Sequence, residues 1–286
     1  MPLVSLKEIL TEARERRYGV LSLLGGNLEM VIGQIIAAEE KGSPVILVFN
    51  QELTPKVPIE LGISLIVNAA KRARVPVATS LDHGRSLESI VKTIDLGSSS
   101  VMFDGSTLPY EENVTKTKEV VRIAHALGVS VEAELGSIAG SSVDLEGRGP
   151  DSSFTDPDVA ADFVERTGVD ALAISFGNVH GVYRGEPHLD LERVRKIRSV
   201  VDIPLVMHGA SGLAESEYKK IVESGISKVC YYTTMAIGAS NDLGRMMADA
   251  GQGATVYHDI ISRAIDYFYT ETKKLIDIVG CSGVVE

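Results

Sequence analysis

Eight short apolar runs alternate along this chain with longer amphipathic stretches, and this alternation leaves few folds open to it. The amphipathic stretches carry apolar residues three and four apart, as helices with one buried face do. They are Leu28–Lys41, Ile59–Arg74, Ser86–Gly97, Asn113–Leu127, Pro157–Thr167, Leu189–Val201 and Ala214–Gly225. The strand-like runs are Tyr18–Leu24, Val45–Phe49, Val75–Leu81, Ser100–Phe103, Val129–Leu135, Ala171–Phe176, Ile203–His208 and Val229–Tyr232.

Strands that alternate with helices imply parallel strands joined by crossover helices. Eight such units in a chain of 286 residues match the usual size of a (β/α)₈ barrel. We therefore expect an α/β fold, a (β/α)₈ TIM barrel spanning 1–286 as a single domain, in preference to an open doubly wound sheet. Tyr257–Gly280 reads as one or two extra C-terminal helices.

The formal net charge is −11 and the isoelectric point is about 5.1. This acidity argues against nucleic acid or an anionic membrane as a partner, because phosphate backbones are bound by basic patches. A small phosphorylated substrate stays open, since backbone N–H groups can hold one phosphate. The two cysteines offer no disulfide framework, and we see neither a secretory signal nor an apolar run of about 18 residues. We expect a cytoplasmic protein.

Three of the six histidines stand at the ends of different strand-like runs, and each precedes a glycine: His83, His180 and His208. In a parallel barrel the carboxyl ends of the strands form the active-site face. Three imidazoles with an open fourth position are a common catalytic zinc site. A lone histidine is more often a hydrogen-bonded core residue, but three at matching strand ends favour a metal site. The remaining histidines, His125, His188 and His258, read as surface or helix residues.

Acidic residues accompany this histidine group. Asp82 precedes His83, where a carboxylate could orient a ligand or act as a general acid/base; the alternative is an N-cap for the following helix. Glu132 and Glu134 share one face of their strand, which we take to be the barrel interior. Two buried acids need a metal or a cationic partner. For Glu132 we favour a structural ion pair.

Small residues follow the last two strand-like runs. The segment from His208 through Ser211 is glycine-rich and precedes a helix, and Thr233 and Thr234 follow the eighth run. Backbone N–H groups in such loops can approach a phosphate closely, and Ser211 can add a hydroxyl. Loops seven and eight are where barrels often bind phosphate.

Four motifs together resemble the class II fructose- and tagatose-bisphosphate aldolases. The motifs are SLDHG from Ser80, VSVEAELG from Val129, GNVHG from Gly177 and LVMHGASGL from Leu205. The segment SVMFDGS from Ser100 also fits, and the resemblance covers nearly the whole chain. It implies a dimeric or tetrameric (β/α)₈ barrel with a catalytic Zn²⁺ and often a monovalent cation, Na⁺ or K⁺, acting on a small phosphorylated sugar.

The resemblance also assigns roles to residues. It makes His83, His180 and His208 zinc ligands and Asp82 the acid/base at the aldehyde oxygen, while Glu134 is an acid that can approach the metal. The residues implied near the phosphate of dihydroxyacetone phosphate are Gly181, Arg184, Gly209, Ser211 and Thr233. Zinc would polarise the carbonyl without a Schiff base. The absence of lysine from the eight runs agrees with that chemistry.

Four departures from the family pattern surround this metal set. Ser142 stands where the family has the glutamate that removes the donor proton, with Asp144 or Glu146 as candidate replacements. Cys230 replaces an asparagine that contacts the donor. The pair Leu23-Leu24 replaces Phe-Asn, and Tyr269, with Arg263 near it, stands where a C-terminal arginine usually binds the second phosphate of a neighbouring subunit.

From these departures we expect that zinc binding persists and that the substrate is a phosphorylated ketose other than plain fructose 1,6-bisphosphate. Two alternatives stay open. One is a retro-aldol epimerase of a phosphorylated sugar, and the other is a catalytically weak paralogue that keeps its metal.

Overall fold

In the computed structural model, eight parallel strands close into a barrel in which each strand pairs with the next along the chain and β8 pairs with β1. The structure describes residues 2–138, 154–183, 185–250 and 255–285. The strands are β1 (Val20–Leu24), β2 (Val45–Phe49), β3 (Val77–Gly84), β4 (Ser100–Phe103), β5 (Ser130–Leu135), β6 (Ala171–Ile174), β7 (Leu205–Met207) and β8 (Ile226–Tyr231). The predicted TIM barrel is confirmed, and the open sheet is excluded.

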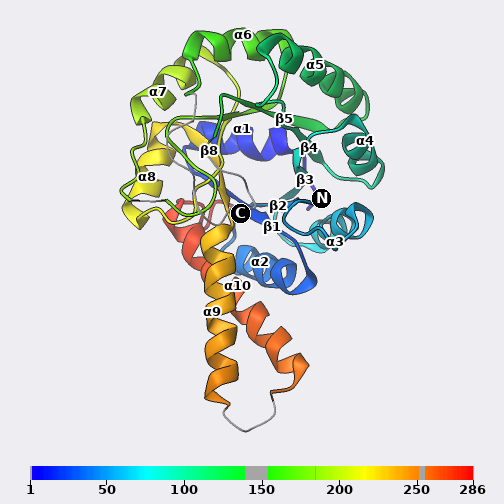
Figure 1. The fold of residues 1–286 in the computed structure, drawn as a ribbon, viewed down its shortest axis with the longest axis vertical. Coiled ribbons are helices and arrows are strands. Elements are labelled where there is room, and N and C mark those ends of the chain that lie inside the picture. Colours follow the sequence, from blue (N-terminus) through cyan, green and yellow to red (C-terminus); the bar gives the residue numbers. More distant parts are fainter. Residues whose placement is uncertain (1, 139–153, 184, 251–254, 286) are drawn as a thin grey trace.

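Helices surround the barrel as an outer layer (Figure 1). The ring is formed by α2 (Leu28–Glu40), α3 (Ile59–Arg72), α4 (Leu87–Asp95), α5 (Tyr110–Ala126), α6 (Pro157–Thr167), α7 (Leu191–Val200) and α8 (Glu215–Ser224). All seven coincide with predicted stretches to within a few residues. None of the helices described combines the length and the apolar character that crossing a bilayer requires.

Helix α1 (Leu6–Arg16) was not among the predicted helices, and it covers the end of the barrel where the strands begin. It contacts β1, β3, β5, β6 and β8. The Lys7 amide donates to Ser130 Oγ at the start of β5 over 3.2 Å, and Leu3 bridges to Val77 at the start of β3. Because α1 covers this end, the opposite end, where the strands finish, is the one open to substrate.

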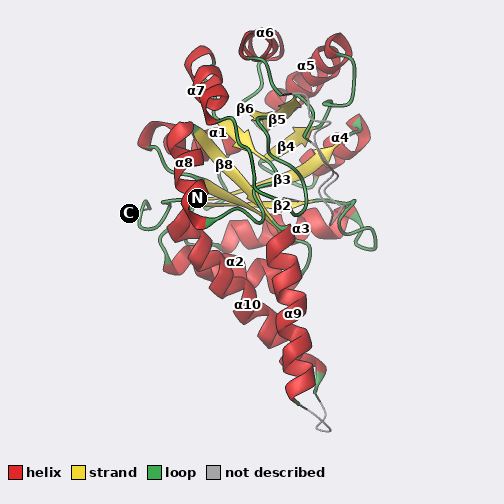
Figure 2. Ribbon diagram, turned by 60° about the vertical axis from the view of Figure 1, so that its left-hand side comes forward, coloured by secondary structure: helices red, strands yellow, loops and turns green. Residues whose placement is uncertain are grey.

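Helices α9 (Thr233–Asp249) and α10 (Tyr257–Ile278) extend away from the barrel as an arm (Figures 1 and 2). The tail is thus a single helix, and α9 is a second that the apolar pattern did not reveal. Helix α10 packs against α2 so closely that a Cβ at Gly33 would lie 2.6 Å from the Ile265 carbonyl oxygen. A glycine is required at this crossing.

A buried ion pair spans the barrel interior. Lys228 Nζ, from β8, donates to Glu132 Oε2, from β5, over 2.6 Å, and both side chains are almost fully buried. These strands are not neighbours in the barrel, so the contact crosses its centre. The structural ion pair expected for Glu132 is confirmed. The predicted runs contain no lysine, but β8 begins at Ile226, three residues before the apolar run that predicted it, and therefore includes Lys228.

Replacing Lys228 with methionine should lower the free energy of unfolding by about 3–5 kcal/mol, because it leaves the Glu132 carboxylate buried without its cation. Urea unfolding followed by circular dichroism measures the effect. The matched control is Lys219→Met on the exposed surface of α8. Equal stability of the two variants would contradict a structural role for the pair.

Candidate metal centre and catalytic pocket

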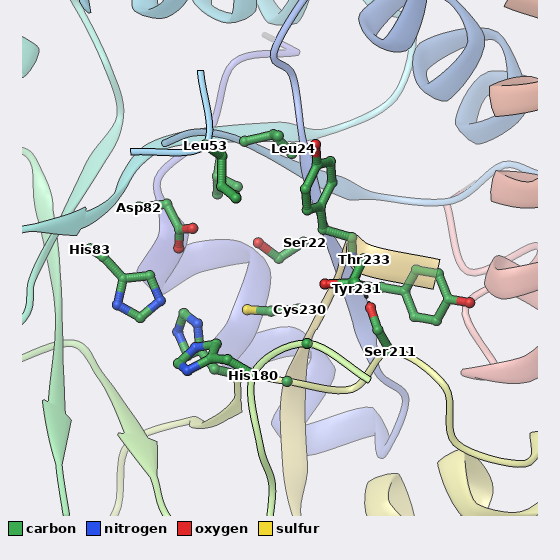
Figure 3. A pocket seen from close by; sticks show the side chains of 15 residues that line it. Ser22, Leu24, Leu53, Asp82, His83, His180, Ser211, Cys230, Tyr231 and Thr233 are labelled. Carbon is green, nitrogen blue, oxygen red and sulfur yellow. Dashed lines mark hydrogen bonds between the residues drawn. The ribbon is translucent and has the colours of Figure 1, made fainter. Parts of the chain in front are cut away.

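The three predicted histidines meet at the carboxyl ends of the strands. His83 lies in β3, while His180 and His208 lie in the loops after β6 and β7. Their ring centroids are 4.6, 5.1 and 5.9 Å apart, and one ring nitrogen of each lies within 4.8 Å of the others. Figure 3 shows Asp82 beside the ring of His83, with His180 below them and Ser22 and Cys230 across from His83; all five residues line the pocket. Three imidazoles at these separations are spaced to share one ion.

Carboxylates hold two of these rings from behind. Asp104 Oδ2 lies 2.9 Å from His83 Nδ1, and Glu132 Oε1 lies 3.0 Å from His208 Nε2. Each ionised carboxylate accepts a ring N–H, and with a metal bound the other nitrogen, His83 Nε2 or His208 Nδ1, would supply the lone pair. Such carboxylate–histidine pairs fix the orientation of metal ligands.

The third imidazole, His180, tests whether the site suits a metal. His180 Nε2 is buried and has no hydrogen-bond partner among the described residues. Burial, and then the charges of His83 and His208, lower the pKa of His180 well below its usual value. The ring is therefore neutral, as a metal ligand must be. A buried nitrogen without a partner costs free energy that a bound cation would recover.

The backbone is distorted where it presents Asp82 and His83. The register of β3 against β4 shifts between Leu81 and Gly84, and His83 adopts a left-handed φ of 50°. Only Arg17 shares a positive φ among the described residues other than glycine. A bulge of this kind turns consecutive side chains toward one face. Here it directs both Asp82 and His83 to the pocket, which both residues line.

Glu134 belongs to a neighbouring group. It lies with His83 and Asp104, and its Oε2 is 3.9 Å from His83 Nδ1, the same ring nitrogen that pairs with Asp104. Its Oε2 is buried and without a hydrogen-bond partner in the described part of the chain. Burial, followed by the charge of Asp104, raises the pKa of Glu134 to about 7. The structure thus places Glu134 behind His83 rather than in the three-histidine set.

Asp82 projects into the pocket (Figure 3). Asn50 Nδ2 donates to its Oδ2 over 3.1 Å. Burial opposes ionisation, but the positive charges of His83, His208 and Lys228 outweigh it and lower the pKa of Asp82. The helix-cap alternative was wrong: Ser86 caps α4, its hydroxyl accepting from the Ser89 amide.

The predicted phosphate-binding residues that the structure describes line the same pocket. Its lining includes Gly181, Gly209, Ser211, Cys230 and Thr233. Gly209 has a φ of 69°, and a Cβ there would lie 2.1 Å from the Val179 carbonyl oxygen, so the loop needs glycine. Helix α9 begins at Thr233, and no side chain caps its first turn. Its free N–H groups can therefore bind an anion. Arg184, Ser142, Asp144 and Glu146 lie outside the described residues.

Several residues of the site were not predicted to act there. Asp104 follows the fourth apolar run as Asp82 follows the third, and the same strand-end rule could have found it. Lys228 was hidden at the polar start of β8. Three further side chains that line the pocket, Ser22, Val48 and Leu53, offered no signal in the sequence.

A family model described as "Fructose-bisphosphate aldolase class-II" matches residues 4–284. The protein YdjI of Escherichia coli K12 is 42% identical over 228 residues, which are 80% of this chain and 82% of that one. A fructose-bisphosphate aldolase of Geobacillus stearothermophilus is 41% identical over 254 residues, 87% of each chain. The crystal structure of the YdjI aldolase superposes with a TM-score of 0.88 over 99% of this chain and 100% of that one, at 35% identity. With its barrel and its strand-end histidines, this chain belongs to the class II fructose-bisphosphate aldolase family, whose members are aldehyde-lyases that generally depend on a metal.

Proposed function

We propose that the enzyme binds Zn²⁺ through His83, His180 and His208 and makes or breaks a C–C bond of a phosphorylated ketose built on a dihydroxyacetone phosphate-type donor. The buried, unpartnered Nε2 of His180 beside two carboxylate-oriented imidazoles carries the proposal. When bound there, zinc supplies a Lewis acid that polarises the donor carbonyl and stabilises negative charge next to it. A monovalent cation and a dimeric or tetrameric assembly belong to the same proposal.

Asp82 is the proposed acid/base at the aldehyde end. It lines the pocket beside His83 and is held by Asn50, so its position is fixed before substrate arrives. The neighbouring positive charges favour its ionised form, which can accept a proton. In the cleavage direction the carboxylate takes the hydroxyl proton as the C–C bond breaks, and in synthesis it returns that proton to the new hydroxyl.

The donor phosphate would lie between Gly181, the Gly209–Ser211 loop and the first turn of α9. Ser211 Oγ accepts the Tyr232 amide over 3.1 Å, which ties the loop after β7 to the start of α9. Its hydroxyl proton is then directed elsewhere and can bind a phosphate oxygen. The helix N-terminus adds N–H donors and the positive end of a dipole.

Two departures from the family pattern bear on the substrate. Leu24 and Cys230 both line the pocket, so an apolar side chain and a thiol replace two amides on that wall. On α10, the Tyr269 hydroxyl donates to Glu40, and the Arg263 guanidinium pairs with Asp242 through two hydrogen bonds of 2.6 and 2.8 Å. Both residues thus have intrachain partners, Glu40 at the end of α2 and Asp242 on α9. This supports a substrate other than fructose 1,6-bisphosphate, in which a second phosphate is not the group recognised.

His208→Ala should lose the metal, because it removes one of three ligands while Glu132 keeps its partner Lys228. Inductively coupled plasma mass spectrometry after dialysis should find less than about a tenth of the wild-type zinc. The matched control is His258→Ala, at an exposed position on α10. Stoichiometric zinc in the His208 variant would refute the ligand assignment.

Asp82→Asn should reduce aldol cleavage by about 10²–10⁴-fold, since the amide keeps an acceptor for Asn50 but cannot take up the proton. The measurement is kcat/KM with a ketose 1-phosphate, together with the zinc content. Retained zinc and lost cleavage are expected. Wild-type turnover in this variant would remove Asp82 from the mechanism.

Zinc-loaded enzyme should exchange one carbon-bound proton of dihydroxyacetone phosphate stereospecifically in D₂O, which NMR detects without knowledge of the aldehyde. Metal-free enzyme is the control. Exchange by the metal-free enzyme would contradict the role proposed for zinc, and no exchange by the loaded enzyme would contradict the proposed donor. Free aldehyde released from the ketose product would then distinguish an aldolase from an epimerase.

A further inference from the structure

A second cavity lies at the covered end of the barrel, opposite the catalytic pocket. It holds about 770 Å³ of space, its open mouth included, between the ends of α1, α7 and α8 and the start of β8. Three arginines line it: Arg14, Arg17 and Arg198. The only acidic residue of its lining is Glu223. The cavity is therefore locally positive, although the net charge of the whole chain is −11.

The arginines repel one another. Burial, and then the charges of Arg14 and Arg17, lower the pKa of Arg198, and Asp202 only partly opposes them. Asp202 is fully exposed and lies 3.4 Å from Arg14 Nη2. An exposed pair at that distance is largely screened by solvent and contributes little. Like charges held together in this way favour a bound anion.

Helix ends account for part of the arrangement. Arg14 Nη2 donates to the Val201 carbonyl at the end of α7 over 3.2 Å, and Arg198 Nη2 donates to the Arg14 carbonyl over 3.5 Å. These contacts satisfy carbonyls that end helices, as basic side chains often do. They do not use Arg14 Nε, which is buried and has no partner within the described ranges. The Arg17 side chain likewise makes no ion pair or hydrogen bond with any other described residue.

The backbone keeps the guanidinium groups at the cavity. Arg17 ends α1 in the left-handed region, with a φ of 61°, one of two positive values outside glycine in the residues described. Gly225 ends α8, and a Cβ there would lie 2.9 Å from Arg198 Cγ. The Arg198 stem therefore crosses the end of α8 through space that only a glycine leaves free. Two unusual backbone positions thus support the same cluster.

We propose that this cavity binds a phosphoryl group, as a phosphate monoester or free phosphate, through Arg14, Arg17 and Arg198. Guanidinium groups match phosphate oxygens in pairs of hydrogen bonds, and three of them can surround a dianion. Arg14 Nε gains the acceptor it lacks. Because β1 and β8 run from this cavity to the catalytic pocket, where they end near Leu24 and Cys230, the site lies on the reverse side of the same strands.

The test is isothermal titration of the zinc-loaded full chain with inorganic phosphate at low ionic strength. Arg17→Gln with Arg198→Gln removes two charges and keeps the first three carbons of each side chain and a polar end. The matched control is Arg195→Gln, on the exposed face of α7. The double variant should bind one phosphate fewer per chain than the wild type and the control. Arg17→Gln alone, at an exposed position, should weaken that site roughly tenfold or more.

The single variant keeps the test open if the double variant fails to fold. Equal stoichiometry and affinity in the wild type and in Arg17→Gln would mean that phosphate binds only in the catalytic pocket. No binding to the wild type at millimolar phosphate would also overturn the proposal.

Discussion

The carboxylate of Glu132 at the centre of the barrel is the group on which the site depends. One of its oxygens accepts from Lys228 and the other from His208. Burial by itself would keep this acid protonated, but the lysine charge and then the histidine lower its pKa. A single residue of β5 thus joins β8 across the core and orients His208, a proposed metal ligand, in the loop after β7. The Glu132 carboxylate therefore serves both the packing of the barrel and the orientation of the site.

Buried polar partners also support His83 and Asp82. Asp104 holds His83 from behind, and it is itself held by Ser106, whose amide and hydroxyl both donate to it. Asn50 holds Asp82 from the neighbouring strand end. His83 and Asp82 are therefore each supported by a buried polar partner on a different element. Such support fixes a site before substrate binds, which is what limits the reorganisation needed during reaction.

Hydrophobic periodicity predicted the barrel because strands buried on both sides read as continuous apolar runs. It failed where polar side chains point into the interior, as at Lys228. Helix α1 could have been found: Leu6, Ile9, Leu10 and Ala13 follow helical spacing, and Ser5 accepts the Glu8 amide as a cap. Helix α9 could not be read in the same way, because it projects from the barrel and buries few of its residues.

The strand-end rule placed the three histidines and Asp82 correctly, because topology alone brings such positions to one face. That rule could not predict which carboxylate pairs with which histidine. His208 and Glu132 are 76 positions apart, and which carboxylate meets which ring depends on barrel register. It also could not separate Glu134 from the three-histidine set, since alternation assigns a face of the strand and not a neighbour.

The left-handed backbone at His83 sets stability and metal binding against each other at one residue. A residue other than glycine held in this region costs roughly 1–3 kcal/mol, and the surrounding fold sustains that cost. Glycine or asparagine would relieve it and would give up the imidazole. Stability alone would therefore favour glycine or asparagine over histidine here, so the histidine is explained by what its side chain can bind.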